Sequence, residues 1–363
     1  MTASATGPLA GVRVLELAGI GPGPYAAMLL ADLGAEVVRV DRLGQGPDAG
    51  HPVTMRGRRM ISLDLKNPDD IERLLKLVEK ADVLLEPFRP GVAERLGVGP
   101  DACLERNPRL VYARMTGWGQ DGPWASMAGH DIGYIAITGA LHAIGRAGGA
   151  PQPPINLLGD FGGGSMFLIV GILAALFERG TSGRGQVVDA AIVDGTASLT
   201  SFLFGMMATG FWTEERGVNL LDTGAPFYDV YETADGEWMA VGALEPQFFA
   251  ELVRILDVDG LPPQHDRSQW PELRARLAAR FKERTRDEWA AAFEGTDACV
   301  APVLSWREAA SHPHIAGRQT LVERDGVLQP APAPRFSRST TTLAEPAHAP
   351  GSDTDAVFAD WLG

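Results

Sequence analysis

Short apolar runs alternate with amphipathic stretches over the first 120 residues. Residues 12–17 form a β-type run, 18–24 a glycine-rich turn and 25–33 a helical stretch, and a second apolar run follows at 36–40. This order predicts a βαβ unit with parallel strands. Further strands are expected at 60–63, 83–85 and 110–115, with helices at 69–80 and 92–96. The pattern predicts a Rossmann-like, doubly wound α/β domain.

The hydrophobic pattern changes in the second half of the chain. Residues 156–205 combine a glycine run with long apolar stretches, 212–245 are strand-like and 247–296 are helical and charged. The longest apolar stretch, Met166–Phe177, has about half of the roughly 20 residues that a membrane span needs, so a buried helix is expected there. Residues 329–351, rich in Pro, Ala, Thr and Ser, are expected to run as an extended surface segment.

Charge and cysteine content narrow the classes of partner. The net charge of −14 argues against nucleic acid. The first 120 residues hold 15 Lys and Arg against 15 Asp and Glu, and the rest hold 17 against 31. An anionic ligand is therefore expected on the N-terminal third, although chance could produce the same imbalance. The isolated Cys103 and Cys299 and a start without a signal-peptide pattern favour a cytoplasmic protein without disulfide or metal site.

The glycine turn at 18–24, followed by Asp41, is similar to a dinucleotide-binding motif. Pro24 occupies the position of the motif's last glycine, and Pro22 and Pro24 remove two N–H donors that a pyrophosphate would need. A tight turn that lines a pocket is therefore preferred over a nicotinamide site.

Three further segments carry candidate chemistry. His130 precedes an expected helix for which Asp131 is the expected N-cap, and a histidine there suits proton transfer near neutral pH. Asp160 is expected just before a helix N-terminus, next to the glycine run at 162–164. Glu245 ends an expected strand. A structural histidine, a helix cap and an ordinary surface glutamate are the respective alternatives.

Basic residues gather near the ends of the expected parallel strands, where ligands bind in α/β folds. They could neutralise phosphate groups, although solvated surface charge would produce the same pattern. The residues are Arg39, Arg56, Arg58, Arg59, Lys66, Arg89 and Arg95.

Several segments resemble, in the same order, the family III CoA-transferase superfamily, and within it most closely the α-methylacyl-CoA racemase branch. The resemblance covers roughly residues 8–345. It is carried by Gly11–Asp41, Leu63–Lys66, Phe88–Gly91, Thr116–Pro123 and Gly183–Asp189.

The resemblance implies an enzyme that acts on acyl-CoA thioesters. The nucleophilic aspartate of the transferases matches Asp160, and the racemase branch adds a histidine that matches His130 and a glutamate that matches Glu245. The implied reaction interconverts (2R)- and (2S)-2-methylacyl-CoA. His130 and Asp160 would exchange the α-proton on opposite faces through an enolate, and Glu245 would orient the imidazole. Backbone N–H groups of Asp160 and of the glycine turn are expected to bind the enolate oxygen.

No metal or redox cofactor is implied, because CoA is part of the substrate. The alternative within the family is a CoA-transferase that moves CoA between carboxylic acids with Asp160 as nucleophile. A dinucleotide-dependent oxidoreductase and a non-catalytic acyl-CoA-binding protein remain as readings outside it.

The resemblance also implies an architecture: an interlocked, ring-like homodimer. A large CoA-binding domain would comprise 1–205 with 315–363, and a small α+β domain 220–310, joined by linkers at 206–219 and 311–314. The active site would lie between the large domain of one subunit and the small domain of its partner, where Glu245 would face His130 of the partner subunit.

The expected binding residues fall into two groups. The CoA-binding group is Arg39, Leu63, Asp64, Leu65, Lys66, Pro87, Phe88, Arg89, Arg95, Gly129, Asp131 and Tyr134. Methionine adapts to more than one partner shape, so Met166, Met206 and Met207 are expected to form an acyl-chain wall, with core packing as the alternative.

Overall fold

The computed structural model describes residues 6–44 and 53–363, which form two compact units. Unit 1 comprises the chain up to Thr138 together with Pro154–Thr200 and Gln319–Gly363. Unit 2 comprises Gly139–Pro153 and Ser201–Arg318.

The units differ from the expected domains at residues 139–153, 201–205 and 315–318, which were expected in the large domain and belong to unit 2. The longest of these segments is 139–153. In the structure this segment packs on unit 2. Arg146 pairs with Asp229 at 2.6 Å, and Arg216 donates to the carbonyls of His142 and Gly149. These contacts span long stretches of sequence, so local composition does not reveal them.

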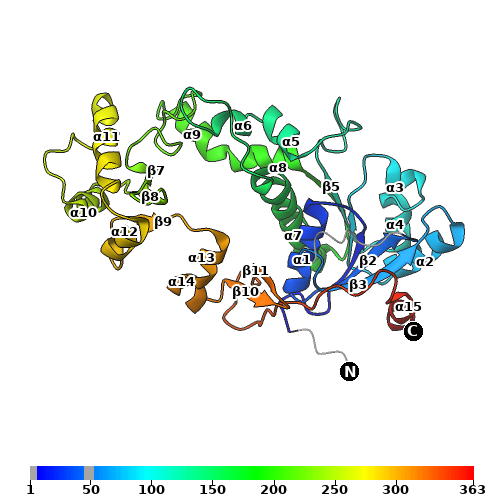
Figure 1. Cartoon of the computed structure of the whole chain (residues 1–363). Helices are drawn as coiled ribbons and strands as arrows, with labels where there is room; N and C mark the ends of the chain where they lie inside the picture. The colour runs from blue at the N-terminus through cyan, green and yellow to red at the C-terminus, as the bar shows by residue number, and fades with distance from the viewer. Residues whose placement is uncertain (1–5, 45–52) are drawn as a thin grey trace. The chain divides into compact units, whose positions relative to one another are not determined.

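A six-stranded parallel sheet forms the centre of unit 1, in the order β3-β2-β1-β4-β5-β6 (Figure 1). This is the strand order of doubly wound dinucleotide-binding folds, so the expected Rossmann-like architecture is confirmed. The strands are rich in Val, Leu and Ile because helices cover both faces of the sheet. They are β1 (Arg13–Leu17), β2 (Glu36–Arg42), β3 (Arg58–Leu63), β4 (Val83–Glu86), β5 (Val111–Thr116) and β6 (Val187–Ala191).

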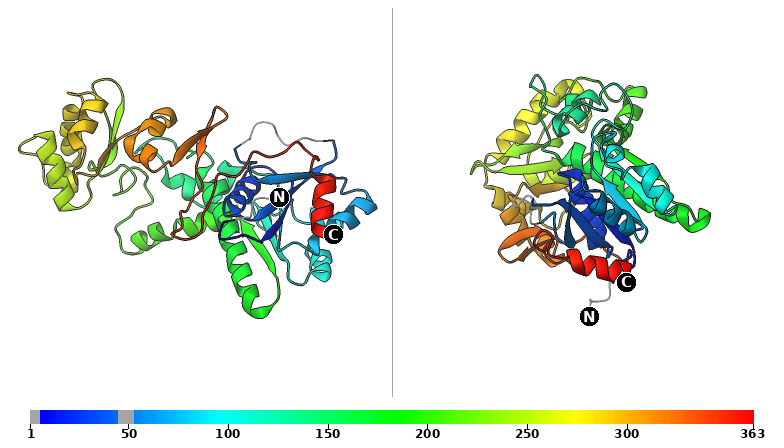
Figure 2. Two further views of the ribbon diagram at one scale, coloured as in Figure 1. Left: turned by 90° about the horizontal axis from the view of Figure 1, so that it is seen from below. Right: turned by 90° about the vertical axis from the view of Figure 1, so that its right-hand side faces the viewer.

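Two apolar clusters fill the space between the sheet and its helices. One face packs against α1 (Pro22–Asp32) and α7 (Phe167–Ser182). The other packs against α2 (Pro68–Val78), α4 (Pro100–Arg106) and the C-terminal helix α15 (Thr354–Leu362), which lies beside β3 and α2 (Figure 2). The remaining helices of unit 1 are α3 (Val92–Arg95), α5 (Asp131–Ile137) and α8 (Ile192–Leu199).

A π-helix, η1 (Leu157–Met166), continues directly into α7. Its wide turns place the Phe161 N–H 3.3 Å from the carbonyl oxygen of Asn156, and its glycines allow α8 to approach closely. A Cβ on Gly163 would lie 2.4 Å from Oγ1 of Thr196. Asp160 therefore lies inside a helix, and the expectation that it precedes a helix N-terminus is wrong. Turns of this type are frequent at functional sites.

The combined helix Leu157–Ser182 has 26 residues and, among the described part of the chain, is long and apolar enough to cross a membrane by length and composition. The expectation of a buried helix is confirmed only for the face that packs in the core, because an apolar stripe that includes Met166, Val170 and Phe177 is exposed. Phe177 is 85% exposed.

Unit 2 contains a three-stranded antiparallel sheet of β7 (Tyr228–Glu232), β8 (Trp238–Gly242) and β9 (Val300–Pro302). An aromatic core that includes Phe227, Phe281 and Trp289 packs it against the helices. The strands and charged helices expected in this region are therefore present. The helices are α6 (Ala140–Ala143), α9 (Ser201–Ala208), α10 (Pro246–Leu256), α11 (Trp270–Phe281), α12 (Arg286–Phe293), α13 (Trp306–Ser311) and α14 (Pro313–Gly317).

The chain returns to unit 1 through a hairpin of β10 (Leu321–Arg324) and β11 (Val327–Pro330). It then runs without helix or strand to α15, as expected for an extended segment. The carbonyl of Glu345 accepts a hydrogen bond from the Gly57 N–H at 2.7 Å, so the segment is attached along unit 1.

Candidate functional site

A cavity of about 570 Å³ lies at the carboxyl ends of β1 to β4 in unit 1. The strand order reverses between β1 and β4, and ligands of open α/β sheets bind at such a point. The segments Ala18–Ile20, Arg39–Arg42 and Leu63–Lys66 line the cavity after β1, in β2 and after β3, with Phe88 and two residues around α3.

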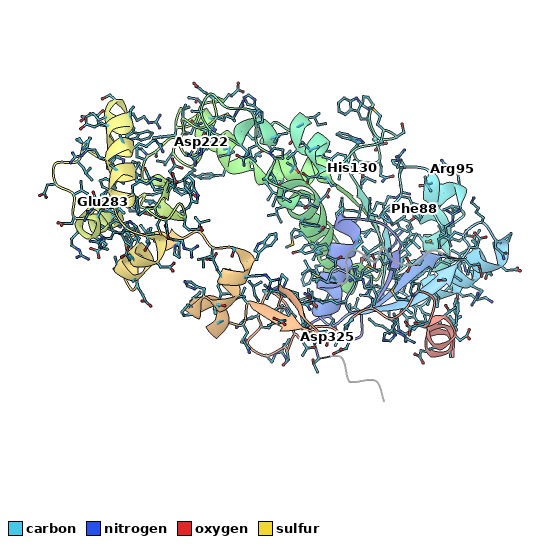
Figure 3. The ribbon with its side chains drawn as sticks, viewed as in Figure 1. Phe88, Arg95, His130, Asp222, Glu283 and Asp325 are labelled. Atoms are coloured by element: carbon cyan, nitrogen blue, oxygen red, sulfur yellow. The ribbon has the colours of Figure 1, made fainter. Side chains whose placement is uncertain are left out.

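Six of the twelve expected CoA-binding residues line the cavity, and the other six do not. The lining members are Arg39, Leu63, Asp64, Leu65, Lys66 and Phe88. The others are Pro87, Arg89, Arg95, Gly129, Asp131 and Tyr134. Phe88 is the second residue after β4, and Arg95 ends α3 (Figure 3). Pro87 lies so close to Gly19 that a Cβ on that glycine would be 2.5 Å from the proline ring.

Arg39 lines the cavity but is 5% exposed, and its guanidinium forms ion pairs. Its Nη1 donates to Glu16 at 2.7 Å and its Nε to Asp41 at 3.1 Å. Arg58 donates to the second oxygen of Glu16 at 3.0 Å. Glu16 of β1 and Asp41 of β2 itself therefore neutralise this arginine, and its expected contact with a CoA phosphate stays a prediction.

Arg56 and Arg59 of the expected basic cluster also form ion pairs. Arg56 pairs with Asp32 at 2.6 Å and Arg59 with Glu36 at 2.9 Å. Arg42 is the cation that the sequence analysis missed. It is exposed, lines the cavity, and forms no ion pair with the described residues. Its place as the last residue of β2 is the signal that could have identified it.

Asp160 is half-buried, and its side chain and backbone have separate partners. Oδ2 accepts a hydrogen bond from the Asn156 side-chain amide at 3.3 Å, and the Asp160 N–H donates to Oδ1 of Asp131 at 2.7 Å. Gly21 lies beside the carboxylate, since a Cβ there would be 3.5 Å from Oδ2. The Ala18–Gly21 turn thus borders both the cavity and Asp160.

The pKa of Asp160 is raised above its ordinary value, chiefly by burial. The hydrogen bond from Asn156 acts against this, Asp131 raises the pKa further, and the charge of His130 lowers it. A carboxyl with a raised pKa is better able to act as a proton donor near neutral pH than an exposed aspartate.

His130 is the N-cap residue of α5 and is exposed. Its carbonyl accepts the Gly133 N–H at 2.8 Å. Asp131 is the first residue of the helix, so its expected role as N-cap is wrong. It instead accepts hydrogen bonds from the backbone of the π-helix. His130 and Asp160 lie close enough for the histidine charge to influence the Asp160 pKa.

Tyr134 of α5 borders the same group. Burial raises the pKa of its hydroxyl, the charge of Asp160 raises it further, and Arg89 lowers it. The Tyr134 ring packs edge-on against Trp118 with ring centroids 4.6 Å apart, and Gly129 fits against both rings. Asp131, His130 and Tyr134 therefore lie around Asp160, and Arg89 and Gly129 are linked to this group through Tyr134.

The backbone N–H of Asp160 is occupied by Asp131, so the expectation that it binds an enolate oxygen is contradicted. Asn156 is a further residue that the sequence analysis missed. Its position four residues before Asp160 places it one helical turn away, but no motif marks it.

The remaining candidates are divided between the units. Glu245 is the N-cap of α10 in unit 2 and is exposed. Of the three expected catalytic residues, His130 and Asp160 therefore belong to unit 1 and Glu245 to unit 2. Met166 ends the π-helix of unit 1 and is 44% exposed, whereas Met206 and Met207 lie in α9 of unit 2. Residues 6–44 and 53–363 contain no group of three or more side chains suited to holding a metal ion.

Comparison with known proteins identifies the family. The model of CoA-transferase family III matches residues 9–355. The chain belongs to this family. Proteins named alpha-methylacyl-CoA racemase from Mus musculus and Homo sapiens are 51% and 49% identical to it. The matches cover 91% and 90% of this chain and 87% and 86% of the relatives.

The same fold is seen in a solved structure of a CAIB/BAIF family protein from Brucella suis. The superposition covers 98% of this chain and 100% of the Brucella suis chain, with a TM-score of 0.84 and a sequence identity of 24%. The resemblance drawn from the sequence motifs is confirmed by the family match.

Proposed function

We propose that this protein is a racemase that interconverts (2R)- and (2S)-2-methylacyl-CoA. The observation that carries the proposal is the pairing of His130 with Asp160 next to a cavity that could hold the nucleotide part of CoA. The names and roughly 50% identity of the mouse and human relatives support the same activity.

Inversion requires a proton to leave one face of the α-carbon and another to arrive on the opposite face. In our proposal His130 serves one face and Asp160 the other, each in the protonation state complementary to that of its partner. The raised pKa of Asp160 favours its protonated form, which is needed in the direction of the reaction in which this carboxyl donates a proton to the α-carbon. Asn156 orients the carboxylate through its hydrogen bond to Oδ2. We assign the enolate oxygen to the turn at 18–24.

We further propose that two chains form an interlocked homodimer, in which Glu245 of the partner subunit orients His130. The assignment of Glu245 to unit 2 agrees with this division of labour. Exposed apolar side chains on α7 and α9, among them Phe177, Phe202 and Phe204, offer surfaces that a second copy could cover. Met166, with Met206 and Met207, is proposed to line the acyl site.

The proposed substrate needs no added metal or redox cofactor for this reaction, because the thioester itself activates the α-hydrogen. The two cysteines are unpaired, which agrees with a cytoplasmic location.

Proton NMR of a single-epimer 2-methylacyl-CoA in deuterated water tests the proposal. We expect the α-hydrogen to be replaced by deuterium while the sample approaches an even mixture of epimers, because both faces exchange protons with groups that equilibrate with solvent. Transfer of CoA to an added carboxylic acid without loss of the α-hydrogen would identify a CoA-transferase instead. Binding without either reaction would indicate a non-catalytic acyl-CoA-binding protein.

Arg42→Gln and Arg39→Gln should have different consequences. Loss of the exposed Arg42 should raise the KM for acyl-CoA about tenfold with unchanged stability, the typical effect of losing one charge-assisted hydrogen bond. Loss of Arg39 should lower the free energy of unfolding by about 3–5 kcal/mol, because it leaves Glu16 and Asp41 buried without their partner.

Steady-state kinetics and urea unfolding of both variants measure these effects. Lys80→Gln removes the same charge from an exposed position outside the cavity lining and serves as the control. Equal KM changes in Arg42→Gln and Lys80→Gln would show that only the overall charge matters.

A further inference from the structure

Arg114 lies at the carboxyl edge of the sheet, 8% exposed, with carboxylates on three neighbouring elements. Glu86 of β4 and Asp189 of β6 are its direct cross-strand neighbours. Glu94 of α3 accepts a hydrogen bond from its Nη2, and Gln120 accepts one from its Nη1 at 2.6 Å. A single guanidinium therefore connects two strands, a helix and the loop after β5.

Glu86 holds the turn that forms one wall of the cavity. It is 2% exposed, and its Oε1 accepts the Phe88 N–H at 2.5 Å. Its Oε2 lies 3.5 Å from Nε of Arg114. Phe88 lines the cavity, as do Val92 and Leu96 of the α3 segment that Arg114 holds through Glu94. Glu86, Arg114 and Glu94 thus support two adjacent walls, although none of the three lines the cavity.

We propose that Glu86 is a positioning residue for CoA binding, which acts with Arg114 to fix the Phe88 turn and α3 as walls of the cavity. The inference rests on the proposed function, because it takes CoA as the ligand of this cavity.

The ionised, buried carboxylate of Glu86 destabilises the folded state. An ion pair retained only for stability would not do so, and this difference points to a functional role for Glu86. Burial raises the pKa of Glu86 to about 7, against the lowering effects of the Phe88 N–H and Arg114. Glu94 of α3 and Asp189 of β6 raise it further. The other titratable groups that face it are Tyr112 of β5 and Cys103 of α4.

The pH dependences of stability and binding therefore have opposite signs. The pKa of Glu86 is near 4.5 in the unfolded chain and near 7 in the folded state. Between these pH values the folded state therefore binds more protons than the unfolded chain. The stabilisation by protonated Glu86 is complete below the unfolded pKa and is lost as the pH rises through about 7. Ionised Glu86, in contrast, makes the stronger hydrogen bond to Phe88 and the ion pair with Arg114.

Glu86→Gln tests this inference, with free coenzyme A as the ligand in isothermal titration calorimetry. The amide keeps the shape of the side chain and removes its charge. At about pH 8 the variant should bind coenzyme A roughly tenfold more weakly than the wild type, as expected for the loss of a charge-assisted contact. Its Tm at the same pH should be higher than that of the wild type.

The pH profiles add a readout that a purely structural role would not change. Between about pH 6 and about pH 8, the wild type should gain affinity relative to Glu86→Gln, and the titration of the ligand phosphate cancels in this comparison. Glu86→Asp keeps the charge but withdraws it from the Phe88 N–H, so it should also weaken binding.

Asp189→Asn is the matched control, because it removes another carboxylate with a burial-raised pKa beside Arg114. It should leave coenzyme A affinity unchanged. Equal affinity of Glu86→Gln and the wild type, a lower Tm of Glu86→Gln at about pH 8, or an equal loss of affinity in Asp189→Asn would overturn the inference. Absence of coenzyme A binding by the wild type would instead overturn the proposed function, and this inference with it.

Discussion

Replacement of either His130 or Asp160 by alanine should lower the rate of racemisation by about 10²–10⁴-fold, the usual effect of losing one general acid or base. Each residue serves one face of the α-carbon in the proposed mechanism, so neither can substitute for the other. The loss should appear in kcat, because the cavity at the ends of β1 to β4 does not depend on either side chain. Epimer ratios followed by chiral analysis of the hydrolysed acid measure the rate.

Asp101→Asn provides the control for Asp160, since Asp101 is an exposed aspartate in the first turn of α4. It should retain the wild-type rate. If His130→Ala kept near-normal racemisation while Asp160→Ala was inactive, the proposed two-base mechanism would be wrong. A covalent route with Asp160 as nucleophile, as in a CoA-transferase, would then account for both results.

The sheet was predictable because five of its strands are short apolar runs between turn signals. The sixth, β6, was not predicted as a strand, since its residues Val187–Asp189 are not buried and carry a polar position. The π-helix could not be predicted from periodicity, because the apolar pattern of 157–182 fits an ordinary α-helix equally well. Its geometry depends on close contact between Gly163 and α8, which lies about thirty residues further along the chain.

The site shows the same division between local and non-local information. The motif positions of His130 and Asp160 identified two residues that the fold brings together. The ion pair of Arg39 was not predictable, because the carboxylate that neutralises it, Glu16, comes from the neighbouring strand in a register that the local sequence does not encode. Asn156 and the Arg114 cluster were missed because their importance depends on three-dimensional neighbours alone.

The arrangement around Asp160 also explains why the chain has glycine at position 159. Asp131 accepts the N–H groups of Gly159 and Asp160, and so anchors the start of the π-helix on α5. A Cβ at position 159 would lie 2.3 Å from Oδ1 of Asp131 and 2.8 Å from Cγ2 of Ile135. The smallest possible side chain would therefore displace the carboxylate that fixes the backbone of Asp160.

Gly159→Ala should lower kcat by about 10²-fold, because a shift of about 1 Å in a catalytic group has an effect of this size. The free energy of unfolding should fall by about 1–3 kcal/mol, as is typical of overpacking. Coenzyme A affinity should stay unchanged, since neither Gly159 nor Asp131 lines the cavity. Single-turnover kinetics, urea unfolding and calorimetry separate the three effects.

Gly180→Ala is the matched control, because this glycine lies in α7 and an added Cβ there meets no atom within 4 Å. It should keep the wild-type kcat and raise the free energy of unfolding by about 0.5–1 kcal/mol, the usual gain from replacing glycine in a helix. A Gly159→Ala enzyme with near-normal kcat would show that the backbone of Asp160 tolerates displacement. The contact with Asp131 would then have no part in placing the carboxyl group that the proposed reaction requires.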